Sequence, residues 1–133
     1  MRWKFAISAA VMFVMLFLLG WAFHGTLLRS DYARIPNLVR PMAEVRGNIL
    51  YTLLAQILTA VAFTWIYLKG REDKPWFAQG LRYGIAVAAL VTVPAGLVHY
   101  AVMPFPLDLI LKQMAVDVVT VVLMGLVLAW IYR

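Results

Sequence analysis

The last part of the chain is a long apolar run with a single carboxylate inside it. The run from Leu109 to Ile131 is interrupted only by Lys112, Gln113, Asp117 and Thr120. As a helix of about 23 residues it rises ~34 Å, which is enough to cross the hydrocarbon core of a bilayer. We therefore expect a transmembrane helix, within which an ionised carboxylate costs roughly 2.5–3.5 kcal/mol.

The polar residues of this run share one face of the expected helix. Gln113, Asp117 and Thr120 follow one another at spacings of four and three residues, which are the spacings that return to the same side of a helix. Because lipid cannot satisfy a carboxylate, this face should point toward other helices rather than toward acyl chains. Asp117 is thus the first candidate for a functional residue.

The composition of the whole chain indicates a membrane protein. Of its 133 residues, 65% are hydrophobic and 14% are charged, which excludes both a disordered chain and an ordinary soluble domain. The pattern predicts an all-α membrane protein, a four-transmembrane-helix antiparallel bundle that forms a single domain, 1–133. The expected spans are about 5–23, 48–68, 77–102 and 109–131, with a semi-ordered outer loop at 24–47 between the first two.

Charge and cysteine content narrow the classes of function. The formal charge is +6, but the basic residues lie between apolar spans, where they set topology and meet lipid headgroups, so we expect no nucleic-acid partner. The chain has no cysteine, which excludes disulfides, thiol redox centres and cysteine-ligated metal sites. The expected partners are the bilayer and other membrane helices.

The basic residues near the span ends favour one orientation. The run 5–23 follows Arg2 and Lys4 and is longer than a usual signal-peptide core, so we expect an uncleaved first helix. With both termini in the cytoplasm, seven basic residues lie inside and five outside, which the positive-inside rule favours. The inside set is Arg2, Lys4, Lys69, Arg71, Lys74, Arg82 and Arg133, and the outside set is Arg29, Arg34, Arg40, Arg46 and Lys112.

The segment 24–47 has the composition of a membrane-surface loop. Pro36 and Pro41 prevent one continuous helix, so we expect short helical or extended pieces on the outer surface. Its four arginines, Arg29, Arg34, Arg40 and Arg46, are expected to anchor the loop at the interface. Alternatively, they bind lipid phosphate, an acidic surface of a partner or a quinone carbonyl.

The third span carries a stripe of small residues and a proline. Gly80, Gly84, Ala88, Thr92 and Gly96 recur every fourth residue. Such a stripe lets another helix approach closely, so we expect it to be a helix-packing surface, and we assign it to contacts within a homo-oligomer or a larger complex. Pro94 should kink the outer half of the span.

Several polar residues gather in the outer half of the predicted bundle because the helices are antiparallel. We predict an intramembrane polar cluster of Asp117, Gln113, Gln56, Asn48 and Thr120, with His24 and His99 at the same depth. In the plainest interpretation these residues are interhelical hydrogen-bonding partners worth about 0.6–2 kcal/mol per contact.

Two functional interpretations of this cluster stay open. In one, Asp117 exchanges a proton or cation while access alternates between the two sides of the membrane, and the third span moves at Pro94 and Gly96. In the other, His24 and His99 ligate a haem b, or bind a quinone together with Asp117. No metal site of another kind and no catalytic constellation for hydrolysis stands out, so we expect no enzymatic activity and no resident cofactor.

Several short segments resemble a group of small four-span bacterial membrane proteins of uncharacterised function. The similar segments are 24–28 with Asp31 and Tyr32, then 65–67 leading into 70–76, then 79–84, and finally Gln113 with Asp117. The resemblance implies the bacterial inner membrane and supplies no activity. From the residues we favour a non-enzymatic accessory or scaffold subunit, with proton- or cation-coupled transport and haem or quinone binding as alternatives.

Overall fold

The structure, a computed structural model, describes residues 2–133 and is entirely helical. It is 84% helical, and no strand occurs among these residues. Within them, four helical segments are long and apolar enough to cross a membrane, which confirms the predicted all-α bundle and a lipid environment. The spans are α1 (Arg2–Ala22) with η1 (Phe23–Leu27), α4 (Ile49–Gly70), α5 (Trp76–Val87) with η2 (Ala88–Thr92) and α6 (Val93–Val102), and α7 (Leu107–Ile131).

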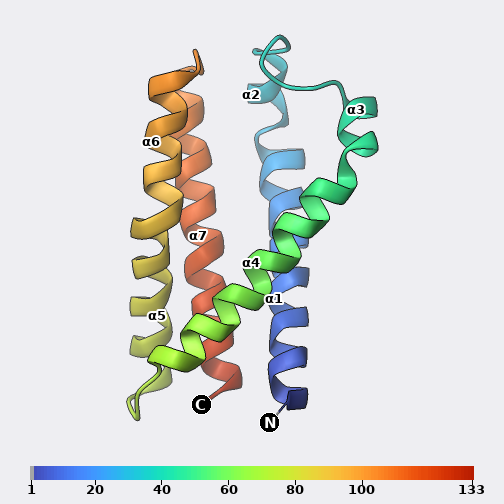
Figure 1. The fold of residues 1–133 in the computed structure, drawn as a ribbon. Coiled ribbons are helices and arrows are strands. Elements are labelled where there is room, and N and C mark those ends of the chain that lie inside the picture. Colours follow the sequence, from blue (N-terminus) through green and yellow to red (C-terminus); the bar gives the residue numbers. More distant parts are fainter. Residues whose placement is uncertain (1) are drawn as a thin grey trace.

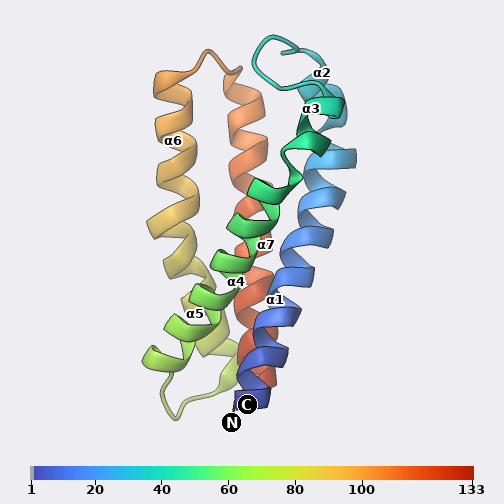
Figure 2. The same ribbon diagram turned by 45° about the vertical axis from the view of Figure 1, so that its right-hand side comes forward.

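The spans are antiparallel, and both ends of the chain lie at the same end of the bundle (Figures 1 and 2). We call this the terminal end, which also carries the turn between α4 and α5. The opposite end, the loop end, carries the connection between η1 and α4 and the turn between α6 and α7. Helices α5 and α7 pack along each other, α4 packs along α1, and α1 also contacts α7. The bundle is thus two helix pairs joined chiefly through α1 and α7.

Glycines bring α5 and α7 into close contact. A Cβ atom added at Gly84 would lie 2.6 Å from the Cα of Val122, and one added at Gly80 would lie 2.7 Å from the carbonyl oxygen of Gly125. The small-residue stripe therefore packs against α7 of the same chain. This corrects our assignment of the stripe to contacts between chains, because α7 already occupies the space beside these small residues.

A wider helical turn keeps the stripe facing α7. In a regular α-helix each four-residue step advances about 400°, so the stripe would drift by about 160° between Gly80 and Gly96. The π-helical turn η2 holds one extra residue and removes about 100° of that drift. A Cβ at Gly96 would accordingly lie 2.4 Å from Cγ of Met114 on α7. The same turn, with the Val93 N–H bonded to the Ala88 carbonyl, precedes Pro94, which lies in the first turn of α6.

The apolar core lies toward the terminal end. Residues of α1, α4 and α7 form one buried cluster, namely Met12, Ala60, Phe63, Tyr67, Met124, Leu128 and Ala129. Tyr83 joins α5 to this core, since its hydroxyl donates to the Phe63 carbonyl at 2.5 Å and the two rings lie 4.6 Å apart. The terminal end is therefore sealed by packed apolar side chains.

The connection at the loop end is more ordered than a loose surface segment. It contains two short helices, α2 (Arg29–Ala33) and α3 (Met42–Gly47). Leu28 and Ile35 of this connection are buried, as are Leu109 and Ile110 at the start of α7. Asn48 links α3 to α4 and accepts a backbone hydrogen bond from Tyr51 at 3.1 Å.

Candidate functional site

Four side chains near the loop end form one continuous line of hydrogen bonds. His24 Nε2 lies 2.7 Å from Asp117 Oδ1, and His24 Nδ1 lies 2.7 Å from the hydroxyl of Tyr32. The Gln113 side-chain amide donates to the same Tyr32 hydroxyl at 2.8 Å. We call these four residues the relay. It joins the first span, the connecting helix α2 and the last span.

The position of His24 depends on a widened turn at the end of the first helix. The segment Phe23–Leu27 is π-helical, and the Leu28 N–H bonds to the Phe23 carbonyl at 2.9 Å, five residues back. This turn carries the helix past the predicted end of the span and includes His24. The chain then folds into α2, so that Tyr32 returns to His24. Single π turns of this kind are frequent at functional sites.

Ion pairs hold α2 against α7 beside the relay. Arg34 bonds Asp108 at 2.7 Å and Asp31 at 3.1 Å, and Lys112 bonds Asp31 at 3.0 Å. We call these four residues the outer clasp. The hydrogen bond to Asp108 raises the pKa of Arg34, so the guanidinium stays charged at any ordinary pH. The clasp positions α2, and with it Tyr32.

Tyr32 is a neutral phenol in this arrangement. Burial raises its pKa above the usual range, and the Asp117 and Asp31 carboxylates raise it further, whereas the hydrogen bond from Gln113 lowers it. Its hydroxyl therefore keeps its proton at neutral pH. It can donate that proton to His24 Nδ1 while it accepts the amide hydrogen of Gln113.

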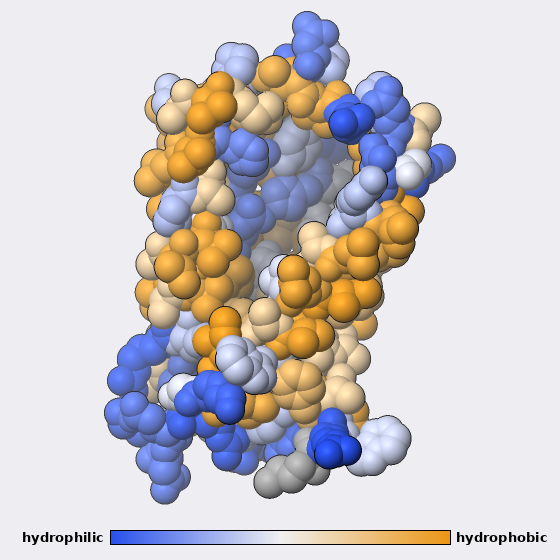
Figure 3. Space-filling view, in the orientation of Figure 1, coloured by the Kyte–Doolittle hydropathy of each residue, from blue (hydrophilic) through white to orange (hydrophobic). Residues whose placement is uncertain are grey.

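The relay is reachable from a hollow in the side of the bundle. Figure 3 shows hydrophilic residues at the bottom of a depression in the loop-end half, between α6 and α4. The side chain of Asp117 is 45% exposed and that of His24 is 33% exposed. Asp117 nevertheless lies ten residues into α7, about 15 Å from its start. An acid and a base are thus accessible within two membrane-spanning segments.

An apolar cavity of about 530 Å³ lies between the helix pairs. Leu58 and Phe63 of α4 line one side, Leu90 of η2 lines another, and Val121 and Met124 of α7 lie opposite. Val121 follows Asp117 by one helical turn, so it lies on the same side of α7. The cavity therefore begins close to the relay, on the side toward the terminal end. We call it the apolar chamber.

The other residues of the predicted polar cluster are not hydrogen-bonded to the relay. Thr120 donates to the Val116 carbonyl of its own helix at 2.9 Å. Gln56 has a buried Oε1 without a hydrogen-bond partner among residues 2–133. His99 is exposed, and its ring lies 5.9 Å from that of Phe105. Asn48 lies in the link between α3 and α4.

The structure therefore selects Asp117, Gln113 and His24 from the predicted residues and adds Tyr32. Sequence analysis had placed Tyr32 within the surface loop and had not considered it for the site. The available signal was its place in the Asp31-Tyr32 pair, directly after the span that ends in His24. Nothing in the pattern indicated that α2 folds back onto α7.

The arginines of the connection have different surroundings. Arg34 belongs to the outer clasp, and Arg40 pairs with Glu44 at 3.3 Å on the surface. Arg29 and Arg46 are exposed and make no ion pair with any of residues 2–133. Only Arg34 is therefore close to the site.

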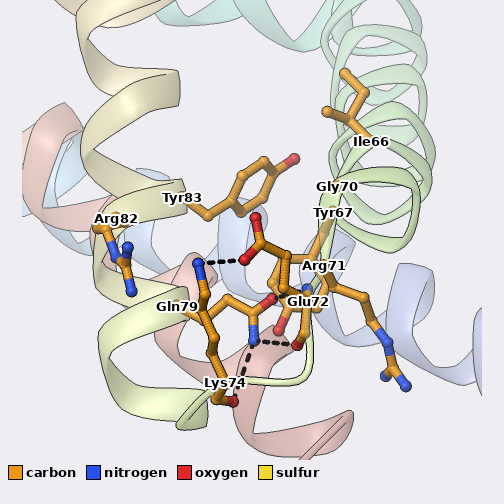
Figure 4. A pocket seen from close by; sticks show the side chains of 9 residues that line it. All are labelled: Ile66, Tyr67, Gly70, Arg71, Glu72, Lys74, Gln79, Arg82 and Tyr83. Carbon is orange, nitrogen blue, oxygen red and sulfur yellow. Dashed lines mark hydrogen bonds and ion pairs between the residues drawn. The ribbon is translucent and has the colours of Figure 1, made fainter.

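A separate polar cavity of about 270 Å³ lies at the terminal end (Figure 4). Its wall is the turn between α4 and α5, which is held by the Gln79 side chain through hydrogen bonds to the Glu72 backbone and to the Lys74 carbonyl. Glu72 also pairs with Lys74, and this contact lowers the pKa of Glu72. These contacts are local to the turn, and they account for its fixed shape.

The donor groups of the relay fit proton exchange better than metal or haem binding. No group of three or more histidine, aspartate or glutamate side chains able to hold a metal occurs within residues 2–133. Both ring nitrogens of His24 already have hydrogen-bond partners, so an iron would have to displace Asp117 or Tyr32. The relay as it stands can accept a proton and pass it along its line of hydrogen bonds.

The comparisons with known proteins give no further identification. No protein-family model, no curated protein and no solved structure matches this chain. The resemblance noted from the sequence therefore stays an interpretation, and the argument for a function rests on the relay itself.

Proposed function

We propose that this protein is a small proton-coupled membrane transporter and that the Asp117–His24 pair takes up and releases the proton. The observation that carries the proposal is the 2.7 Å contact between these two side chains, which lie on the first and last spans. Ionisable residues within membrane spans are costly, so an acid paired with a base there is a functional site by default. Histidine adds a group that changes charge near neutral pH.

The relay has two hydrogen-bonding patterns that differ by one proton. When His24 is neutral, its Nε2–H donates to the Asp117 carboxylate and its Nδ1 accepts from the Tyr32 hydroxyl. When a proton is added, both ring nitrogens donate, and the Tyr32 oxygen accepts from His24 as well as from Gln113. The Tyr32 O–H must then turn to another acceptor. Proton uptake is thereby coupled to a change at α2.

The shape of the bundle supports alternating access. The relay is exposed in the loop-end half of the bundle, while the packed core lies toward the terminal end. A second conformation would have to open that core, and the π turns η1 and η2 lie in the first and third spans. The arrangement is that of one end state of such a cycle.

The orientation that belongs to this proposal places the terminal end in the cytoplasm of a bacterium and the loop end outside its inner membrane. The basic residues near the span ends support it, as the positive-inside rule describes. A cysteine at Ser30 should then react with a membrane-impermeant thiol reagent in intact cells, and a cysteine at Asp73 should not. The reverse labelling pattern would require the opposite orientation.

The test of the proposed function is proton flux in reconstituted vesicles. A pH gradient should drive flux, reported by a trapped pH-sensitive dye, in the native protein, and Asp117→Asn should reduce it by at least about tenfold because the variant cannot exchange a proton. Glu44→Gln is the matched control, since this carboxylate is exposed, pairs with Arg40 on the surface and does not contact the relay or the outer clasp. Equal flux in native protein and Asp117→Asn would refute the proposal.

A second candidate, a subunit of a larger membrane complex, has one observation in its favour. The loop-end half of α4 packs on α1 and leaves large apolar side chains exposed, among them Leu50 at 64% and Leu54 at 55%. A partner helix could cover them. Cysteines at Leu54 would crosslink to a partner in native membranes if this is so, whereas cysteines at Gly84 would only disturb α7. If no crosslink formed, the subunit hypothesis would be excluded and the monomeric transporter would remain.

A further inference from the structure

The apolar chamber lies one helical turn of α7 from Asp117, since Val121 lines it. The chamber holds about 530 Å³, which lies within the range of cavities that bind drug-sized molecules. Most of its lining is aliphatic or aromatic, from α1, α4, α5, η2 and α7. Asp117 lies one turn from Val121 of its wall. A ligand that fills the chamber therefore has a carboxylate within reach at one end.

One oxygen of this carboxylate is unused. His24 bonds Oδ1 of Asp117, and Oδ2 makes no hydrogen bond or ion pair with any of residues 2–133. A carboxylate accepts at both oxygens, and an unpaired oxygen within a membrane span is expensive to keep. A donor from a ligand would satisfy it.

The charges around Asp117 favour a positive ligand. In the outer clasp, Arg34 and Lys112 pair with Asp31 and Asp108, so these four residues cancel. Tyr32 is neutral, and neither α4 nor α6 contributes an ion pair or a hydrogen bond to the relay. With His24 neutral, the site carries one net negative charge. With one added proton it carries none.

The chamber is open to the bilayer rather than only to water. Leu58 of α4 is 71% exposed and Leu90 of η2 is 78% exposed, although both line the chamber. These two side chains border an opening between α4 and the third span. A molecule already dissolved in the membrane can enter through this opening without passing through water.

We propose that the site takes a lipophilic cation, with its apolar body in the chamber and its positive charge at Asp117, and that this cation competes with the proton of the relay. The inference rests on the proposed function for its physiological meaning, since competition for one carboxylate is what would couple the two fluxes. Binding itself does not require transport. It can be measured on its own.

The experiment is equilibrium binding of tetraphenylphosphonium to the full chain in lipid nanodiscs. Binding should weaken by about tenfold or more in Asp117→Asn, and it should weaken in the native protein on acidification, because either change removes the negative charge. Uncharged triphenylphosphine oxide, which is of similar shape, should bind more weakly than the cation and show no pH dependence.

Two variants test the place of binding independently of the charge. Leu90→Trp fills the chamber and should abolish most of the binding. Ile85→Trp is its control, because Ile85 is 53% exposed on the same span but does not line the chamber. Circular dichroism and gel filtration identify any variant that fails to fold, and Asp117→Glu should recover binding where Asp117→Asn does not.

Each outcome decides the inference. Equal binding of the charged and uncharged compounds, unchanged binding in Asp117→Asn or in Leu90→Trp, or no binding of the cation at all would overturn it. If the cation binds as described but proton flux does not depend on Asp117, the binding site stands and the transport function falls. If flux depends on Asp117 but no cation binds, transport stands and this ligand class is wrong.

Discussion

The two halves of α7 differ in how they contact the rest of the bundle. The half toward the terminal end packs backbone to backbone on α5 through Gly80, Gly84 and Gly125, and it contributes Met124 and Leu128 to the buried core. The half toward the loop end adds polar contacts to its apolar ones, because its polar side chains form part of the relay and the outer clasp. One helix is thus a packing element at one end and a site element at the other.

This difference separates stability from activity within a single span. Close backbone contact is intolerant of added atoms but needs no particular chemistry, because only volume matters there. The relay tolerates changes of volume better, since it borders a hollow, but it depends on which atoms donate and accept. Substitutions in the first half should therefore act mainly on folding, and substitutions in the second mainly on proton chemistry.

The largest expected effect on stability is that of Gly84→Leu. Its Cβ would lie 2.6 Å from the Cα of Val122 and 3.2 Å from the Val121 carbonyl oxygen, and backbone atoms cannot move aside. We expect a loss of at least about 3 kcal/mol in the free energy of unfolding, measured by detergent titration. Gly20→Leu is the control, since nothing lies within 4 Å of a Cβ there. Equal losses in both variants would erase the contrast between the two halves.

A smaller effect is expected when the acid and the base of the relay are removed. In a double-mutant cycle, His24→Asn and Asp117→Asn should show a coupling energy of about 1 kcal/mol, typical of polar contacts between membrane helices. Proton flux should fall far more than stability does. Strictly additive effects on unfolding would mean that the contact between the two side chains contributes nothing to the fold.

Tyr32→Phe tests the middle of the relay and its pH dependence. The variant leaves His24 Nδ1 and the Gln113 amide without their common partner, so the free energy of unfolding should fall by about 1 kcal/mol. Because burial raises the pKa of Tyr32, the folded state holds this proton more tightly than the unfolded chain. Native stability should thus decline as the pH rises above about 10, and less steeply in the variant.

The control for Tyr32→Phe is Tyr51→Phe. Tyr51 is 75% exposed, and its hydroxyl makes no hydrogen bond with any of residues 2–133. Its replacement should leave the stability at neutral pH unchanged. If the free energy of unfolding declined equally steeply with pH in the native protein and in Tyr32→Phe, burial would not raise the pKa of this phenol.

The smallest effect should come from the outer clasp. Arg34→Gln removes the contacts to Asp108 and Asp31. The side chains of Arg34 and Asp108 are about half exposed, and exposed ion pairs contribute little. Asp31 is only 12% exposed, but it keeps its contact with Lys112. Any loss of stability should be smaller than that of Tyr32→Phe and should disappear in about 1 M salt, which screens the charges. Arg29→Gln is the control. A large, salt-independent loss in Arg34→Gln would make the clasp a structural element equal to the packed half.

The fold followed from the sequence more directly than the site did. Four apolar runs of membrane-spanning length are visible in the hydropathy alone, and the structure confirms them. The relay depends on how each helix is rotated, and the widened turn at His24 has no local signature. Six polar residues shared the expected depth of Asp117, and hydropathy cannot rank them. The partner of the glycine stripe was more accessible, since Gly125 and Ala129 form a matching four-residue step on the last span.

The extra residue held in η2 makes the third span sensitive to a single deletion. Without it, everything beyond Thr92 would turn by about 100°, and Gly96 would leave Met114 while Gly80 and Gly84 stayed in place against α7. If one alanine at 88 or 89 were deleted, α5 would keep its contact with α7. Helix α6, with His99, would then face a different side of the bundle. The number of residues in η2 therefore determines which face of α6 meets α7, independently of which side chains η2 carries.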